Sequence, residues 1–463
     1  MIHDTDTAAA PVTIIGAGIA GSEAAWQLAS RGVPVELMEM RPDVMGPAHH
    51  TGLFAELVCS NSLKGQDPST AAGMLKAELA ALGSMVLRSA HETRVSAGGA
   101  LAVDREAFAA LVTETVQSHP LIHVVRAEAT HLPPGDVIVA AGPLVTDRLA
   151  ACLLDLVGSR RLAFYDAAAP IVAAESIDRE HVFAASRWGK GSPDYLNCPL
   201  TKDQYDALVN ALTGAARVHA KAFERQELFA ACQPVEEVAR TGHDALRYGA
   251  LKPVGLTDPQ TGRRPWAVVQ LRPETRDATA YNLVGFQTNL TFPEQRRVFS
   301  LIPALTSAEY LRYGVMHRNT FIDAPSVLTP GLAVRTEPRI RVAGQLSGTE
   351  GYLEAAASGL LAALDVWTSR NAQAPVVLPP STALGALVAY ATDPDTTGYQ
   401  PMHVNFGLMP PLEPPVRRKR ERYAAYADRG DRDLTAYLTS RPDLDRIRAV
   451  DAPLPGGPGA TSL

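Results

Sequence analysis

The chain has 463 residues, of which 46% are hydrophobic and 20% are charged, and its formal net charge is −6. This length exceeds one ordinary domain, and the hydrophobic content is typical of a globular protein with a large core. No apolar run approaches the roughly 20 residues of a membrane helix, and the negative charge argues against generalised nucleic-acid binding, although a local basic face is still compatible with RNA.

The N-terminus and the cysteines indicate the compartment. Residues 1–10 contain acidic residues and no cationic stretch, so we expect no secretory signal and a cytoplasmic protein. The four cysteines are widely spaced and form no C-x-x-C pair. We therefore expect reduced thiols and no metal site.

A glycine fingerprint follows the first predicted strand. The apolar run 12–15 precedes a G-x-G-x-x-G segment that opens a helix of small residues. The first glycine allows a tight turn, the second lets backbone approach a pyrophosphate, and the third lets the helix pack closely on its strand. A second predicted strand, 35–39, ends at Glu39, where a ribose hydroxyl needs an acceptor. The alternative is a glycine-rich turn without a ligand. The candidate residues of this nucleotide site are Gly16, Ala17, Gly18, Ile19, Ala20, Gly21 and Glu39.

Further segments predict the rest of an α/β fold. Asp104 is expected to cap a helix whose apolar residues share one face. The run 135–143 predicts a buried strand that ends at Gly142 and a proline turn. The runs 171–174 and 339–344 predict two more strands of the same doubly wound sheet. Because they lie far apart in the chain, we expect an inserted α/β domain to interrupt a discontinuous Rossmann-type domain.

The predicted boundaries follow from these segments. We expect the first part of the dinucleotide-binding domain over 11–185, the inserted domain over 186–329, the second part over 330–375, a helical and basic segment over 376–450, and a disordered tail over 451–463. In the second part, Gly344 follows a strand, and Gly351 and Tyr352 open a helix of small residues whose N-terminal dipole would stabilise an anion such as a reduced flavin.

Three other features leave alternatives open. Cys59, among small polar residues, is either a reactive thiol or a packed one. His317 by its spacing alone is more typical of a satisfied structural histidine. The run Arg417, Arg418, Lys419 and Arg420 is either a solvated face or a contact for RNA phosphates.

Several blocks together resemble one known family. They are the fingerprint, Leu57-Val58-Cys59-Ser60-Asn61-Ser62, Cys232-Gln233-Pro234-Val235-Glu236, Lys252-Pro253-Val254-Gly255-Leu256, Met316-His317-Arg318-Asn319-Thr320 and Glu350-Gly351-Tyr352-Leu353-Glu354. This combination resembles the folate- and FAD-dependent tRNA (uracil-5-)-methyltransferases, TrmFO, which are relatives of the GidA (MnmG) flavoproteins. The resemblance extends from about residue 11 to about residue 440.

The resemblance implies methylation of carbon 5 of the T-loop uridine, position 54, of tRNA. The carbon would come from methylenetetrahydrofolate, and the reducing equivalents from NADH or NADPH through FAD. It also implies that Cys232 is the nucleophile, with Cys59 in support, since uracil C5 becomes nucleophilic when a thiolate adds at C6. The implied folate contacts are His317, with His50 as second choice, Tyr352 and Arg318. The alternatives are a ribosomal RNA uridine as target, a flavin oxidoreductase without an RNA substrate, and a GidA-like partner subunit.

Overall fold

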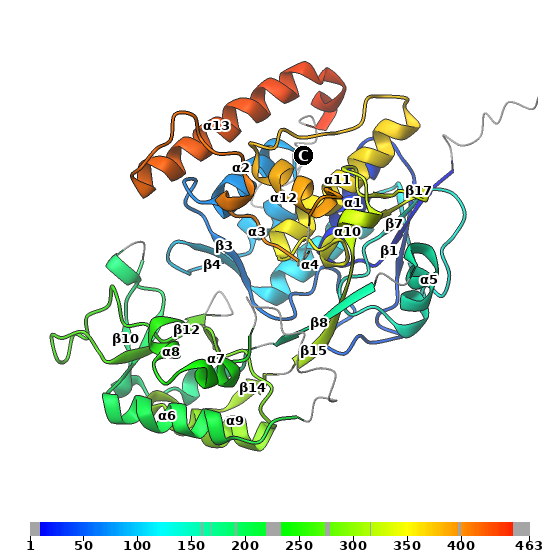
Figure 1. The fold of residues 1–463 in the computed structure, drawn as a ribbon. Coiled ribbons are helices and arrows are strands. Elements are labelled where there is room, and N and C mark those ends of the chain that lie inside the picture. Colours follow the sequence, from blue (N-terminus) through cyan, green and yellow to red (C-terminus); the bar gives the residue numbers. More distant parts are fainter. Residues whose placement is uncertain are drawn as a thin grey trace, which may run out of the picture.

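The structure, a computed structural model, describes residues 10–158, 161–167, 169–189, 192–218, 233–273, 278–314, 316–396, 399 and 401–447, with the backbone alone for 161–167, 316–319 and 445–447. It has two lobes (Figure 1). The larger lobe combines the N-terminal and C-terminal parts of the chain, and the smaller lobe is formed by the middle part. Within the described residues, no helix is long and apolar enough to cross a membrane.

A parallel sheet forms the centre of the larger lobe. Its strand order is β16-β17-β7-β1-β2-β6, and all neighbouring pairs are parallel except β16 with β17. The chain order reverses beside β1, which pairs with β2 on one side and β7 on the other, so this is the doubly wound arrangement that the sequence predicts. The strands are β1 (Val12–Ile15), β2 (Val35–Glu39), β6 (Ile122–Arg126), β7 (Val137–Val139), β16 (Ala333–Val334) and β17 (Glu337–Val342).

Two helices of small residues, α1 (Ile19–Ala29) and α11 (Tyr352–Arg370), pack against each other beside this sheet (Figure 1). A Cβ atom at Gly359 of α11 would lie 2.2 Å from the carbonyl oxygen of Ala20, and one at Gly21 would lie 1.8 Å from that of Gly16. Glycine is therefore required at both contacts, since a real Cβ cannot approach backbone so closely. The predicted small-residue helices are confirmed, and their small size permits this approach.

The other helices of the larger lobe cover the rest of its core. Asp104 caps α4 as predicted, since its carboxylate accepts from the backbone N–H groups of Glu106 and Ala107. A small antiparallel sheet, β3-β5-β4, lies nearby. The bounds are α2 (Ala71–Ala81), α3 (Met85–Glu92), α4 (Arg105–Gln117), α5 (Asp147–Val157), α10 (Ala324–Val327), α12 (Ala383–Thr392), α13 (Lys419–Ser440), β3 (Ser62–Gly65), β4 (Arg94–Val95) and β5 (Ala100–Val103).

The smaller lobe contains a second, antiparallel sheet of order β10-β11-β12-β13-β9-β14. The prediction for residues 171–174 is wrong, because β9 pairs with β13 and β14 in this sheet and not with the parallel one. The second sheet thus begins before residue 185, although the α/β class of the insertion is as expected. Its elements are β9 (Ile171–Ala173), β10 (Phe183–Ala184), β11 (Leu196–Leu200), β12 (Ala267–Pro273), β13 (Ala280–Leu283), β14 (Tyr310–Arg312), α6 (Lys202–Gly214), α7 (Val235–Thr241), α8 (Ala245–Tyr248) and α9 (Phe292–Phe299).

A two-stranded antiparallel ladder connects the lobes. It pairs β8 (Arg161–Ala167) with β15 (Met316–Ile322), so the chain enters and leaves the smaller lobe side by side (Figure 1). The backbone N–H of Thr320 on β15 donates to the carbonyl of Pro143, 2.8 Å away. The ladder therefore ends against the turn that follows β7.

Candidate active-site cleft

A cleft opens at the carboxyl ends of β1, β2, β6 and β7, where a doubly wound sheet binds its ligand. It holds about 1040 Å³ of space, its open mouth included, which is enough for a dinucleotide. Of the candidate nucleotide-binding residues, the cleft is lined by Gly16, Gly18, Ile19, Ala20, Glu39, Gly142, Gly344 and Tyr352.

The glycines of the cleft leave room for a ligand. A Cβ atom at Gly18 or Gly142 would meet no atom within 4 Å, so a side chain there would project into the open cleft. Gly16 has a different role: its φ is +98°, and its Cβ would lie 2.7 Å from the carbonyl oxygen of Ala140. The turn after β1 therefore needs Gly16 for its conformation and Gly18 for the space beside it.

Three of the candidate nucleotide-binding residues, Ala17, Gly21 and Gly351, do not line the cleft but contact or precede residues that do. The backbone N–H of Ala17 donates to Glu39 Oε2, 2.8 Å away. Gly21 faces the carbonyl of Gly16, as described above. Gly351, with φ +118°, lies beside Glu354 and Lys64 and begins α11, so it sets the position of Tyr352.

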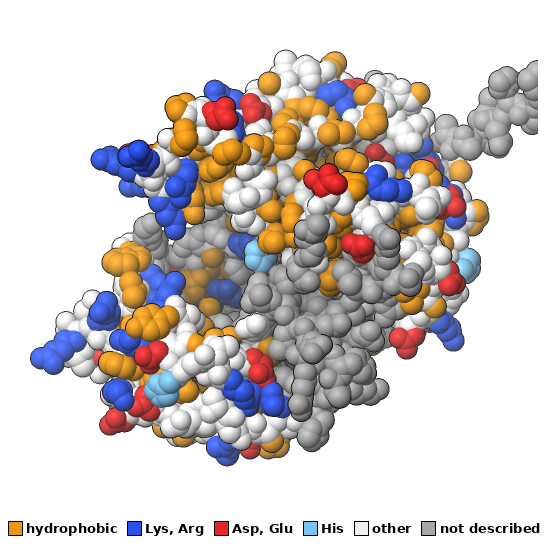
Figure 2. Space-filling model, viewed as in Figure 1, with side chains coloured by type: hydrophobic (Ala, Val, Ile, Leu, Met, Phe, Trp, Pro, Cys, Tyr) orange, Lys and Arg blue, Asp and Glu red, His pale blue; other side chains and the backbone are white. Residues whose placement is uncertain are grey.

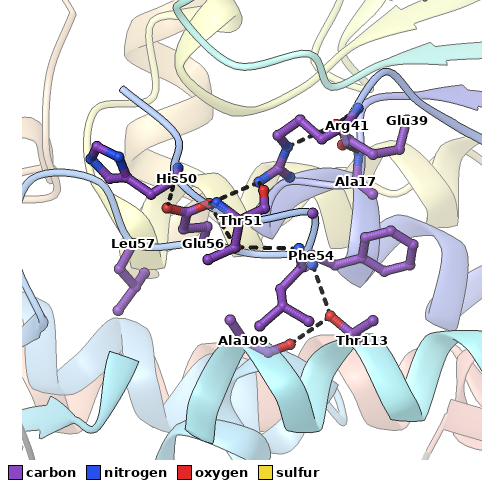
Figure 3. A network of polar contacts seen from close by, with 12 residues as sticks. Ala17, Glu39, Arg41, His50, Thr51, Phe54, Glu56, Leu57, Ala109 and Thr113 are labelled. Atoms are coloured by element: carbon purple, nitrogen blue, oxygen red, sulfur yellow. Dashed lines mark hydrogen bonds and ion pairs between the residues drawn. The ribbon is translucent and has the colours of Figure 1, made fainter. Parts of the chain in front are cut away.

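Glu39 belongs to a buried polar network (Figure 3). Its Oε1 accepts from the backbone N–H and the Nε of Arg41, at 3.0 and 2.9 Å, and Arg41 Nη1 also donates to Glu56 Oε2 at 3.1 Å. Burial favours a higher pKa for Glu39, but the hydrogen bonds and charge of Arg41, with the Ala17 N–H, lower its pKa below the ordinary value. Glu39 is thus an ionised acceptor at the edge of the cleft.

His50 lies at the outer end of the same network. Its backbone N–H donates to Glu56 Oε1, 2.9 Å away, and its side chain is exposed (Figure 3). Its neighbour His49 lines the cleft instead. Burial and the nearby Arg41 guanidinium lower the pKa of His49 to about 4, so His49 is neutral at physiological pH. The structure therefore places His49, and not His50, among the cleft residues.

Cys59 contacts Tyr352 at the inner end of the cleft. The Tyr352 hydroxyl lies 3.0 Å from the Cys59 thiol sulfur and accepts from the Cys59 backbone N–H at 3.0 Å. Burial and the neighbouring Cys59 raise the pKa of Tyr352 well above its usual value, so the phenol stays protonated. Val58 and Tyr352 both line the cleft, and the Cys59 thiol is therefore next to the ligand space.

Three arginines hold the segment that contains Cys59, and two of them come from the smaller lobe. Arg105 Nη1 of α4 donates to the carbonyl of Leu57 at 2.6 Å, and Arg312 of β14 donates to that of Val58. Arg272 of β12, which is 7% exposed, donates to Asn61 Oδ1 and to Ser60 Oγ, each at 2.8 Å.

Asn61 completes this connection between the lobes. It is fully buried, and its side-chain amide donates to the carbonyls of Val103 in the larger lobe and Pro273 in the smaller lobe, at 3.0 and 2.9 Å. A buried amide with its donors bonded on both sides leaves the segment little freedom. The position of Cys59 therefore depends on how the smaller lobe docks.

The remaining candidates from the insertion are placed only in part. Cys232 lies outside the described residues. His317 and Arg318 lie on β15, where their backbones pair with Asp166 and Tyr165 of β8, and their side chains are not described. The strand that contains them reaches the cleft through Thr320 and its contact with Pro143.

Arg417, Arg418, Lys419 and Arg420 are all exposed at the start of α13. Figure 2 shows this face of the molecule hollowed between the lobes, with Lys and Arg side chains gathered at the end of α13 that overhangs the hollow. Nearby, Tyr423 and Tyr426 pack on Phe406, with ring centroids 4.7 and 5.1 Å apart. The four cations are exposed, although Arg418 pairs with Glu421 at 3.1 Å and Lys419 lies 5.4 Å from the centroid of the Tyr423 ring.

Several lining residues do not appear among the sequence candidates. They are the residues that follow other strands: Met38, Met40 and Arg41 at the end of β2, Ala127, Glu128 and Ala129 after β6, and Pro143 to Thr146 after β7. Their position directly after parallel strands is the sequence feature that could have identified them. No such feature marks the contact between Cys59 and Tyr352, or Arg272.

The fold and the cleft define a class: a doubly wound dinucleotide-binding protein with an antiparallel lobe inserted between its halves. The family model described as "Glucose inhibited division protein A", GIDA, matches residues 11–374. The protein named "Methylenetetrahydrofolate--tRNA-(uracil-5-)-methyltransferase TrmFO" from Desulforudis audaxviator is 54% identical over 432 residues, which are 93% of this chain and 98% of the relative. Its namesake from Geobacter sulfurreducens is 54% identical over 93% of this chain and 99% of its own length. The chain therefore belongs to the GidA family and, within it, to the TrmFO group.

Solved structures agree with this fold. Aquifex aeolicus GidA in the form II crystal has a TM-score of 0.67 and 16% sequence identity, over 95% of this chain and 75% of that one. The form I crystal gives a TM-score of 0.64 at the same identity. At this identity the likeness concerns the fold alone. It confirms the α/β fold with an inserted domain.

Replacing Arg272 by Met should loosen the Cys59 segment. Loss of the charged hydrogen bonds to Ser60 and Asn61 should lower the free energy of unfolding by about 2 kcal/mol and raise the rate at which iodoacetamide alkylates Cys59 severalfold, as followed by peptide mass spectrometry. The control is Arg247→Met, because Arg247 packs on Trp266 with its guanidinium 4.0 Å from the ring centroid, outside this segment. Unchanged Cys59 alkylation in Arg272→Met would show that the smaller lobe does not position the thiol.

Proposed function

We propose that this protein binds FAD in the cleft and methylates carbon 5 of the T-loop uridine, position 54, of tRNA. Methylenetetrahydrofolate is the carbon donor, and NADH or NADPH supplies the reducing equivalents through FAD. The observation on which this rests is the 54% identity, over 93% of the chain, to relatives named TrmFO. The cleft geometry supports it independently, since a dinucleotide site and a thiol meet there.

The cleft residues fit the FAD molecule. The open space beside Gly18 and Gly142 suits a pyrophosphate at the N-terminus of α1, and Glu39 is ionised where a ribose hydroxyl needs an acceptor. The apolar and small lining near Tyr352 suits a flat ring. When bound, the flavin supplies the hydride that takes the transferred carbon from the methylene to the methyl level.

The chain's own residues handle the thiol and proton chemistry. A thiolate adds to uracil C6, which makes C5 nucleophilic. C5 gains the carbon and loses its proton, and the bond between that carbon and the folate nitrogen breaks, so that tetrahydrofolate leaves. Once the hydride has reached the carbon, the thiolate leaves C6 by elimination and the C5–C6 double bond is restored. We assign this nucleophile to Cys232. Cys59 and the protonated Tyr352 hydroxyl form a hydrogen-bonded pair that can hold or move a proton at the inner end of the cleft.

The folate and RNA contacts complete the proposal. His317 is our choice for the residue that covers the folate ring, and Arg318 for its glutamate tail or an RNA phosphate. The exposed cations at the start of α13 suit RNA phosphates at the rim of the hollow (Figure 2).

Mass spectrometry of undermodified tRNA tests the activity. Incubation with the purified protein, methylenetetrahydrofolate and NADPH should add one methyl group at uridine 54, and omission of the folate should abolish the product. If ribosomal RNA is methylated and tRNA is not, the proposed reaction stands but its substrate is a ribosomal RNA uridine. A protein that consumes NADPH but methylates neither RNA would contradict the proposal.

Replacing Gly18 by Val should abolish flavin retention. A Cβ at Gly18 meets no protein atom within 4 Å and projects into the cleft, so the fold should persist while flavin occupancy falls from about one per chain by at least about tenfold, ~1.4 kcal/mol of affinity. Absorbance near the flavin band of the purified protein measures it. The matched control is Gly99→Val, another glycine with open space around its Cβ but outside the cleft. A yellow Gly18→Val protein would place the cofactor elsewhere.

Replacing Arg417, Arg418, Lys419 and Arg420 together by Ala should weaken tRNA binding and flatten its salt dependence. If all four meet phosphates, the slope of log affinity against log salt should fall by roughly 3. Flavin reduction by NADPH should stay unchanged. The control is Arg297→Ala on α9, where Arg297 is paired with Glu294 at 2.5 Å. An unchanged slope would mean that the run at α13 is only a solvated face.

A further inference from the structure

Trp188 combines an exposed aromatic ring with a left-handed backbone conformation on the surface of the smaller lobe. It is 69% exposed, whereas Trp26 is 9% exposed and Trp266 and Trp367 are partly buried. A single exposed aromatic ring is ordinary on a protein surface, but at Trp188 the exposure coincides with a strained backbone.

The backbone of Trp188 adopts an unfavourable conformation that its neighbours maintain. Its φ is +61°, in the left-handed region that a bulky residue rarely adopts. Its N–H donates to the carbonyl of Gly255, 2.9 Å away. A non-glycine residue in this region persists only where the surroundings over-determine it, and such residues concentrate at functional sites.

One face of the indole is supported and the rest is open. A Cβ at Gly255 would lie 2.9 Å from both Cε2 and Nε1 of Trp188, so the ring rests on a bare glycine whose own φ is +82°. The absence of a side chain at Gly255 lets the indole lie against backbone. One face of the ring therefore packs on Gly255, and the rest of the ring is open to solvent.

Two cations belong to the same two segments as this ring. Arg187, the preceding residue, is held against the segment of Gly255, since its Nη1 donates to the carbonyl of Val254 at 2.8 Å and its Nε to Gln270 at 3.0 Å. Lys252 is exposed on the adjoining turn. The acidic group on the following loop, Asp194, accepts from the Gly98 backbone N–H of the larger lobe at 2.6 Å.

We propose that Trp188 is a stacking platform for an unpaired base of the RNA substrate, with Arg187 and Lys252 beside the neighbouring phosphates. An open aromatic face with cations next to it is the arrangement that binds single-stranded or looped nucleic acid, because every base has a π-face and every nucleotide a phosphate. This proposal rests on the proposed function, since it names a contact of the same substrate. It adds a contact from the smaller lobe to the phosphate contacts at α13.

The test is the affinity of the flavin-loaded protein for a T-arm RNA hairpin, measured for three substitutions. Trp188→Ala should weaken binding about tenfold. Trp188→Phe, which keeps an aromatic face, should stay within about threefold of the wild type, and Trp188→Leu should resemble the alanine variant. The salt slope should not change, because no phosphate contact is lost.

The control variant is Phe292→Leu. Phe292 is another exposed ring of the smaller lobe, 49% exposed, with one face stacked on Tyr313 at a centroid distance of 4.6 Å. Its replacement tests whether any exposed ring contributes, and RNA affinity should be unaffected. Wild-type affinity in Trp188→Ala, or full rescue by Leu, would overturn the proposal. A loss confined to the KM for methylenetetrahydrofolate would also overturn it and identify the ring as a pterin contact. A wild-type protein that binds RNA but does not methylate it refutes only the proposed function, and one that binds no RNA refutes both.

Discussion

The close approach of α1 and α11 is the constraint on which the cleft depends. Any side chain at Gly359 of α11 would meet the backbone of Ala20 on α1, and any at Gly21 of α1 would meet that of Gly16 in the turn before this helix. The two helices therefore pack at backbone contact, and both begin at the cleft, where Gly18 and Tyr352 line the same space. Two positive helix ends directed at one cleft favour an anionic ligand.

The second structural principle is that the smaller lobe holds part of the site in the larger one. Arg272 and Arg312 come from the antiparallel sheet, and they bind the segment on either side of Cys59. The surface at Trp188 and the thiol beside Tyr352 therefore belong to one connected structure.

The sequence predicted the local features well because each has a local physical cause. The glycine fingerprint, the Asp104 cap and the small-residue helix all follow from neighbouring residues. The run 171–174 was assigned to the wrong sheet, since a short apolar strand has the same pattern in a parallel and an antiparallel sheet. The contact of Cys59 with Tyr352 joins residues 293 positions apart, which spacing cannot reveal. The roles of Cys232 and His317 came from resemblance to a family.

The central claim is that this fold places a flavin ring against Tyr352 and the Cys59 thiol. A crystal structure of the purified, flavin-loaded protein is its most direct test. We expect electron density for the pyrophosphate beside Gly18, for the ribose beside Glu39, and for the isoalloxazine ring in contact with Tyr352. A flavin bound in the reverse direction, with its adenine at Tyr352 and its ring beside Ala127 to Ala129, would contradict the account.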